Sequence, residues 1–268
     1  MRIDLIALDL DGTLLDPAER VTERSRRAIR AVLDRGVRVV LVTGRGVDLP
    51  IRISRELGLN LPVICCHGAL TKDFGANRTL AHVPLPLQYA KPMVEFAERE
   101  GLSVAIYLEE SFWRLEGSQV YMSDMLGPGW REAKRFEDVM HEAPTFIRFL
   151  GDDSVRAMER EFADWPVAFR YETWGTFREC AVLNRDASKR NALARLCADF
   201  QIARERVLAI GDSPNDVPML RWAGTGVAMG NAPPLVKEAV RYVTARNSED
   251  GVALAIERLL LEPKKRPA

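Results

Sequence analysis

Short apolar runs rich in β-branched residues alternate with amphipathic stretches at both ends of the chain. Runs that predict strands lie at residues 3–10, 37–42, 63–66, 207–210 and 225–229. Thr22 is placed to cap a helix after the first run, and a closing helix is expected at 252–261. Strands that alternate with helices are typical of a parallel sheet covered by helices on both faces. The two ends of the chain are therefore predicted to form one doubly wound, mainly parallel, Rossmann-like α/β sheet.

The segment from about residue 80 to 183 interrupts this alternation and has a different composition. It holds every tryptophan of the chain except Trp222. Strands are predicted at 104–108, 112–115, 145–150, 167–171 and 176–183, and helices at 88–99 and 154–162. We therefore predict an α/β domain at residues 82–183, inserted into a core formed by residues 1–81 and 184–268.

Charge and cysteine content exclude several classes of function. Lysine plus arginine (38) equals aspartate plus glutamate (38), so no net field attracts nucleic acid or an anionic membrane, and neither partner is expected. The four cysteines show no C-x-x-C spacing, which favours buried thiols over a disulfide or zinc framework. No leader sequence and no apolar run of about 18 residues is found. The expected location is the cytoplasm.

Two aspartates two residues apart, Asp9 and Asp11, follow the first predicted strand in the sequence DLDGT. Open α/β sheets bind ligands beyond the carboxyl ends of their strands, so these carboxylates lie at the expected edge. Neighbouring carboxylates stay ionised together only beside positive charge, which a divalent cation would supply. Aspartate can also attack phosphorus or transfer a proton. The alternative interpretation is a polar turn in which Gly12 adopts a positive φ.

Three further groups lie at comparable places in the chain. Thr43 and Gly44 follow the second strand in TGR and offer a hydroxyl and an open backbone amide to a phosphate. Asp212 and Asp216 follow a later strand in GDSPND, and magnesium prefers carboxylate oxygens. Lys189 begins a helix in DASKRNAL. Each group alone has an ordinary alternative: a capped helix start, an Asx turn or a solvated lysine.

Together, DLDGT, TGR, the helix lysine and GDSPND resemble the four motifs of the haloacid dehalogenase superfamily. The closing segment GVAMGNAPPLVKEAVRYVTARNSEDGVALAIERLL is similar to the Cof-type phosphatase branch, which carries a large α/β cap domain between its second and third motifs. The resemblance covers about residues 1–80 and 184–262. It implies a catalytic core of this superfamily, an inserted α/β cap domain and a phosphoric monoester hydrolase.

The resemblance also implies a role for each matching residue. Asp9 would be the nucleophile and a magnesium ligand, and Asp11 the general acid/base and a ligand through its backbone carbonyl. Lys189 would neutralise the nucleophile and the phosphoryl oxygens. The implied phosphate-binding residues are Thr43, Gly44, Arg45, Lys189 and Asn215, and the further metal ligands are Asp212 and Asp216, with support of Lys189 as an alternative role for Asp216. An acid at Asp11 separates the chain from the dehalogenases and phosphonate hydrolases of the superfamily, which lack one there.

One departure from the family pattern lies after the third predicted strand. The family often has NGA there, whereas this chain has HGA at residues 67–69. We expect His67 to be a surface-loop residue, with contact to the substrate as the alternative.

These observations predict a magnesium-dependent phosphatase of small phosphorylated metabolites, sugar phosphates among them, that acts through an aspartyl-phosphate. The alternatives are a phosphomutase of the same superfamily and a non-catalytic sensor of phosphorylated metabolites. A dinucleotide-dependent oxidoreductase, suggested by GTGVAMG at residues 224–230, is disfavoured by its G-x-G-x-x-x-G spacing. We expect a monomer or a homodimer.

The inserted domain is expected to recognise the leaving group and to close over the site, because the core residues named above grip only phosphate and metal. Its aromatic and arginine side chains suit a sugar face or a second anion. Candidates are Tyr107, Trp113, Arg148 and Trp174, with a purely structural role as the alternative for each.

Overall fold

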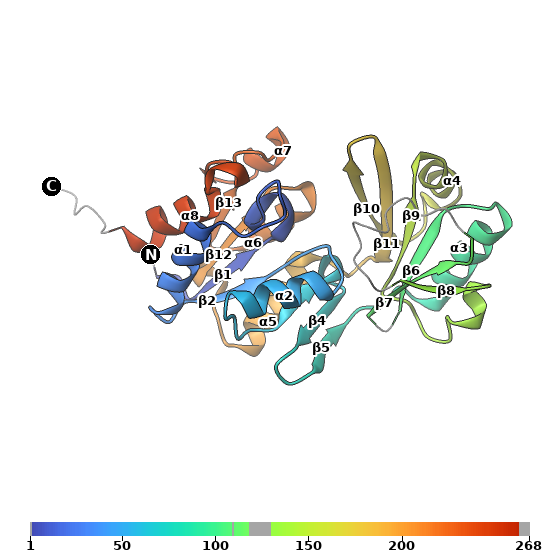
Figure 1. Cartoon of the computed structure of the whole chain (residues 1–268), viewed down its shortest axis with the longest axis horizontal. Coiled ribbons are helices and arrows are strands. Elements are labelled where there is room, and N and C mark those ends of the chain that lie inside the picture. The colour runs from blue at the N-terminus through green and yellow to red at the C-terminus, as the bar shows by residue number, and fades with distance from the viewer. Residues whose placement is uncertain (1, 109, 118–129, 263–268) are drawn as a thin grey trace. The chain divides into compact units, whose positions relative to one another are not determined.

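The computed structural model describes residues 2–108, 110–117 and 130–262, and the chain divides into two compact units (Figure 1). The core unit consists of Met1–Ala81 and Ser188–Ala268, and the insert unit of His82–Ala187. In the described part of the chain, no helix combines the length and the hydrophobicity needed to cross a bilayer.

A five-stranded parallel sheet forms the centre of the core unit. Its strands, in spatial order, are β14 (Tyr242–Val243), β13 (Thr225–Ala228), β12 (Val207–Gly211), β1 (Leu5–Leu8) and β2 (Arg38–Leu41). All adjacent pairs are parallel, and Leu5 lies opposite Val207 on one side and Arg38 on the other. Every residue of β1 is buried, because helices cover both faces of the sheet. The prediction of a doubly wound parallel sheet is confirmed.

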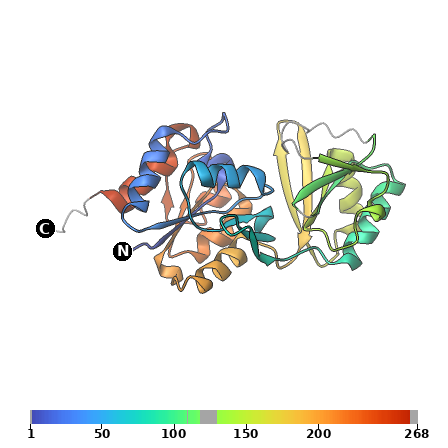
Figure 2. The same ribbon diagram turned by 60° about the horizontal axis from the view of Figure 1, so that its bottom comes forward.

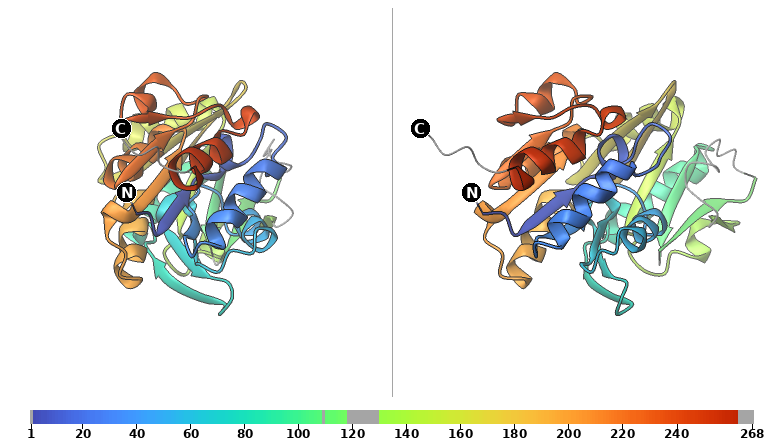
Figure 3. Two further views of the ribbon diagram at one scale, coloured as in Figure 1. Left: turned by 90° about the vertical axis from the view of Figure 1, so that its left-hand side faces the viewer. Right: turned by 60° about the vertical axis from the view of Figure 1, so that its left-hand side comes forward.

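Two groups of helices supply these covering layers. The helices are α1 (Glu23–Leu33), α2 (Asp48–Glu56), α5 (Lys189–Asp199), α6 (Val217–Trp222), α7 (Pro234–Lys237) and α8 (Gly251–Ile256). α1 and α8, drawn in blue and red, pack together on one face (Figure 3). α5 and α6 pack against each other (Figure 2), and their buried side chains share a hydrophobic cluster with every second residue of β1 and β12. The predicted cap of α1 is confirmed, since the Thr22 hydroxyl accepts a hydrogen bond from the Ser25 N–H.

The third predicted strand does not extend the parallel sheet. It forms β3 (Val63–Cys65), which pairs with β4 (Leu70–Asp73) in a three-stranded sheet completed by β5 (Arg78–His82). Cys66, His67 and Gly68 all have positive φ, so the chain reverses directly after β3 and pairs antiparallel with its own continuation. The parallel bridge Val42–Ile64 links β3 to the end of β2.

The insert unit has a mixed six-stranded sheet of its own. In spatial order its strands are β10 (Val167–Trp174), β11 (Phe177–Asn184), β9 (Phe146–Leu150), β6 (Val104–Leu108), β7 (Ser111–Leu115) and β8 (Trp130–Ala133). Among the strand pairs described in this sheet, only β7 and β8 are parallel. One face packs on α3 (Leu87–Arg99) and α4 (Asp152–Phe162) around buried residues that include Ile106, Ile147 and Val182. The expected inserted α/β domain is confirmed; β8 was not predicted.

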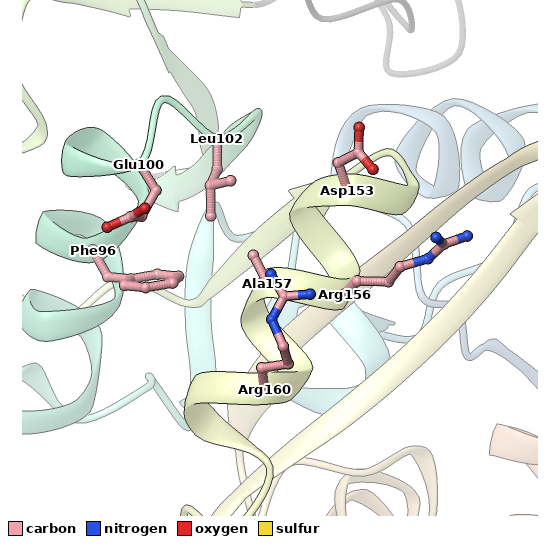
Figure 4. Close-up of a pocket in the computed structure, with 7 residues that line it drawn as sticks. All are labelled: Phe96, Glu100, Leu102, Asp153, Arg156, Ala157 and Arg160. Carbon is pink, nitrogen blue, oxygen red and sulfur yellow. The ribbon is translucent and has the colours of Figure 1, made fainter.

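A pocket lies between α3 and α4 in the insert unit (Figure 4). It is lined by Phe96 and Leu102 and by the charged side chains of Glu100, Asp153, Arg156 and Arg160. The two acidic and two basic groups balance, so this pocket offers no net positive charge to a phosphate.

Candidate active site

The candidate site lies at the carboxyl end of the parallel sheet, where β1 and β12 end side by side. Asp9 follows β1 directly, and its backbone N–H donates to the carbonyl oxygen of Ile210 in β12 over 3.1 Å. Asp212 follows β12 directly. Parallel neighbouring strands thus bring together two aspartates that are 203 residues apart in sequence, at the edge where such sheets bind ligands.

The turn Leu10–Leu14 explains why a glycine and a threonine follow the two aspartates in DLDGT. Gly12 has a φ of +70°, and a Cβ at this position would lie 2.2 Å from Asp212 Oδ2, so only glycine fits. The Thr13 hydroxyl donates to Asp212 Oδ1 over 3.2 Å. The turn therefore both approaches and orients the carboxylate of the neighbouring strand.

Lys189 lies buried between two carboxylates at the start of α5. Its Nζ donates to Asp9 Oδ1 over 2.6 Å and to Asp216 Oδ1 over 2.7 Å. The other oxygen of Asp216 accepts from the backbone N–H groups of Asp212 and Ser213 at 3.1 and 3.0 Å. Ser188 places Lys189 here by capping α5, because its hydroxyl accepts from Asn191 N–H.

The acids of this cluster outnumber its cation. Asp9, Asp212 and Asp216 each offer a carboxylate oxygen, and these three oxygens lie within 4.8 Å of one another. Burial and then the charge of Asp216 raise the pKa of Asp9 well above its usual value, although Lys189 acts in the opposite sense. Burial and then Asp216 raise the pKa of Asp212 to about 6. Burial acts to lower the pKa of Lys189, but Asp216 and Asp9 raise it overall, so the ammonium stays charged.

The donor set of this cluster fits a divalent cation. With all three carboxylates ionised against one ammonium, this buried site would carry two excess negative charges, which is the charge that one divalent ion compensates. Asp9 and Asp212, from adjacent strand ends, would hold it. A metal contact through the backbone carbonyl of Asp11 stays a prediction.

The side chain of Asp11 lies outside this acid cluster and pairs with Arg45. Arg45 Nη2 is 2.6 Å from Asp11 Oδ1 and also 2.6 Å from Glu19 Oε1, and Arg45 Nε lies 3.0 Å from Asp11 Oδ2. Burial acts to lower the pKa of Arg45, but Asp11 and Glu19 raise it overall. The structure thus joins the predicted acid/base to a residue predicted to bind phosphate.

Thr43 and Gly44 lie after β2 and directly precede Arg45, which pairs with Asp11. The Thr43 hydroxyl accepts from the backbone N–H of Arg45 over 3.1 Å. A Cβ on Gly44 would lie 2.4 Å from Cε1 of His67, so this glycine is required by close contact with the imidazole. The expectation that His67 is a surface-loop residue is wrong: its side chain is 1% exposed, because the reversal after β3 turns it onto Gly44.

Two asparagines complete the described surroundings of the site. Asn215 accepts a hydrogen bond from the Ser213 hydroxyl over 2.7 Å in the turn that ends at Asp216. Asn231, which the sequence analysis missed, donates to the Gly12 carbonyl over 2.8 Å and to Asp212 Oδ2 over 3.2 Å. Its position after β13, the next strand of the sheet, is the signal that could have identified it.

The candidate residues of the insert unit are largely buried within it. Tyr107 is 1% exposed and stacks on Phe146 at a centroid distance of 5.2 Å. Arg148 is 4% exposed and forms an ion pair with Glu179 at 3.4 Å. Their burial favours the structural alternative for both. Trp113 packs partly buried against the hydrophobic core of the unit. The side chain of Trp174 is outside the described part.

Comparison with known proteins decides the family. The model of the haloacid dehalogenase-like hydrolase family matches residues 6–256, a range that covers the insert unit and most of the core unit. The chain belongs to this family. The resemblance read from the four motifs is therefore confirmed, including the Cof-type branch, and the protein is a phosphatase of the haloacid dehalogenase superfamily.

Relatives and a solved structure match along nearly the whole chain. The 5-amino-6-(5-phospho-D-ribitylamino)uracil phosphatase YcsE of Bacillus subtilis is 31% identical, with 97% of this chain and 96% of the relative covered. The pyridoxal phosphate phosphatase YbhA of Escherichia coli is 26% identical, with 94% and 97% covered. A haloacid dehalogenase-like hydrolase from Bacteroides thetaiotaomicron has a similar crystal structure, with a TM-score of 0.86, 28% identity and coverage of 97% and 100%.

Proposed function

We propose that this phosphatase hydrolyses small phosphorylated metabolites, sugar phosphates among them, in a magnesium-dependent reaction through an aspartyl-phosphate. The observation that carries the proposal is the contact of Lys189 with Asp9 inside the acid cluster. A buried nucleophile, a fixed ammonium and two excess negative charges are what phosphoryl transfer requires when a divalent cation is added.

Each proposed step uses one of the two aspartates that follow β1. Asp9 attacks phosphorus, and the bond between phosphorus and the leaving oxygen breaks while Asp11 gives that oxygen a proton. Asp11 then takes a proton from water, whose oxygen attacks phosphorus and releases Asp9 and inorganic phosphate. A bound divalent cation would offset the repulsion between carboxylate and phosphate.

The remaining site residues bind and orient. Lys189 neutralises Asp9 and a phosphoryl oxygen, and the Thr43 hydroxyl and the backbone N–H of Gly44 bind the other oxygens. Arg45 holds Asp11 through their ion pair, and its contact with a phosphate stays a prediction from the TGR motif. Because Asp216 is completely buried and forms an ion pair with the ammonium of Lys189, we assign to it the support of Lys189.

The proposal for the substrate class rests on the relatives. One relative is named for a phosphorylated ribityl compound and another for pyridoxal phosphate, and both are small phosphate monoesters. A core unit that binds only the phosphate and the metal can act on substrates with such different leaving groups. The insert unit would then select between these substrates.

A phosphate-release screen over phosphorylated metabolites, with magnesium and with a chelator, tests the proposal. We expect release from at least one small metabolite, dependent on magnesium and lost in Asp9→Asn. Release only in the presence of an activating bisphosphate would indicate a phosphomutase. Tight binding of a phosphorylated metabolite without any turnover would indicate a sensor, and either result would overturn the proposal.

A further inference from the structure

Asn231 bridges two parts of the candidate site from a third strand end. It lies in the loop after β13, and its Nδ2 donates to the backbone carbonyl of Gly12 over 2.8 Å and to Asp212 Oδ2 over 3.2 Å. One amide group therefore binds both the turn that carries Asp11 and the carboxylate of Asp212, which follows β12.

The orientation of this amide is fixed from its other side. Asn231 Oδ1 accepts the backbone N–H of Asn247 over 3.0 Å, so the oxygen faces a donor and the nitrogen faces the two acceptors. The loop itself is anchored, since Gly230 N–H donates to the carbonyl of Ala245 over 2.9 Å. These two hydrogen bonds therefore hold the side-chain N–H group of Asn231 in its orientation toward Asp212.

The kind of donor matters for the charge on Asp212. Its Oδ1 accepts from the Thr13 hydroxyl and its Oδ2 from Asn231, and both donors are neutral. Asp216, by contrast, is paired with the ammonium of Lys189. Neutral donors orient a carboxylate without cancelling its charge, so the carboxylate of Asp212 can still attract a cation.

We propose that Asn231 is a positioning residue, which aims the carboxylate of Asp212 at the divalent cation and ties it to the turn carrying Asp11. The inference rests on the proposed function, because it gives Asp212 the role of a metal ligand. Outer partners of metal ligands typically change metal affinity by about 10- to 100-fold when they are removed.

Manganese binding to the whole protein, measured by electron paramagnetic resonance without substrate, tests the inference. Asn231→Ala is compared with Asn247→Ala, a matched control. Asn247→Ala loses the side-chain hydrogen bond to the Leu15 carbonyl but keeps the backbone N–H that supports Asn231. Asp212→Asn serves as the control for the metal site. Melting in a chelator verifies folding, and Asn231→Ser replaces Asn231→Ala if the latter fails to fold.

We expect at least about a 10-fold loss of manganese affinity in Asn231→Ala and less than about a 3-fold loss in Asn247→Ala. The magnesium concentration needed for half-maximal activity should rise in parallel. Equal losses in the two variants, or wild-type affinity in Asn231→Ala while Asp212→Asn binds weakly, would overturn the inference and leave the proposed function standing. Wild-type affinity in Asp212→Asn would instead remove the proposed metal site, and the inference with it.

Discussion

At the scale of single residues, the site combines charges that are costly to bury. Lys189 and Asp9 are both nearly inaccessible to solvent and lie 2.6 Å apart, and Asp216 is completely buried on the other side of the ammonium. Buried charges persist only when they are paired, so each member of this set depends on the others. Substitution of Asp9 therefore tests the chemistry of the site, and substitution of Lys189 tests its stability.

Asp9→Asn is expected to lower kcat by at least about 10²-fold, because an amide is a poor nucleophile for phosphorus. The fold should remain intact, since the substitution preserves volume and relieves repulsion with Asp216. Steady-state phosphate release measures the effect, and circular dichroism provides the control. A variant with the wild-type rate would refute the assignment of Asp9 as nucleophile.

Lys189→Met is expected to destabilise the protein, because it leaves two buried carboxylates without their cation. Removing one partner of a buried pair typically costs about 3 kcal/mol or more, which corresponds to a fall in Tm of roughly 10 °C for a chain of this size. Calorimetry in a chelator measures the change, with Lys91→Met, at an exposed lysine of α3, as a matched control. An unchanged Tm would show that the pair contributes no net stability.

At the scale of elements, periodicity and capping predicted the parallel sheet and α1, because apolar runs and Thr22 act locally. The pairing of β3 was not predictable in this way. It depends on the positive φ values at Cys66 and His67, residues that rarely adopt them. The motifs likewise placed Asp9 and Asp212 at strand ends, whereas the pairing of Arg45 with Asp11 depends on tertiary geometry.

The elements bury all four cysteines, and this predicts unreactive thiols in the folded protein. Cys65 lies in β3, Cys180 in β11 and Cys197 in α5. Burial raises the pKa of Cys180 to about 12 and that of Cys197 to about 11. At pH 8 the thiolate of Cys180 is then on the order of 10³-fold scarcer than that of a free cysteine. Titration with a chromogenic disulfide should detect no fast thiol before denaturant is added and four afterwards; a fast native reaction would contradict the burial.

At the scale of the whole molecule, the two units have separate hydrophobic cores. Leu5, Leu193 and Met219 belong to one cluster of the core unit, and Ile106, Phe149 and Val182 to one of the insert unit. All residues that we assign to phosphate and metal lie in the core unit. We therefore propose that the core unit carries the chemistry and the insert unit the choice of leaving group.

Replacing residues 82–187 by a short Gly/Ser linker tests this division. The core unit keeps its own sheet and its buried cluster, so the shortened protein is expected to fold, which circular dichroism and melting verify. It should hydrolyse a small aryl phosphate weakly, because the acid cluster and Lys189 are retained while the groups that exclude water and bind the leaving group are lost. Its values of kcat/KM for different metabolites should converge. A folded, shortened protein that kept the selectivity of the full chain would show that the core unit itself distinguishes the substrates.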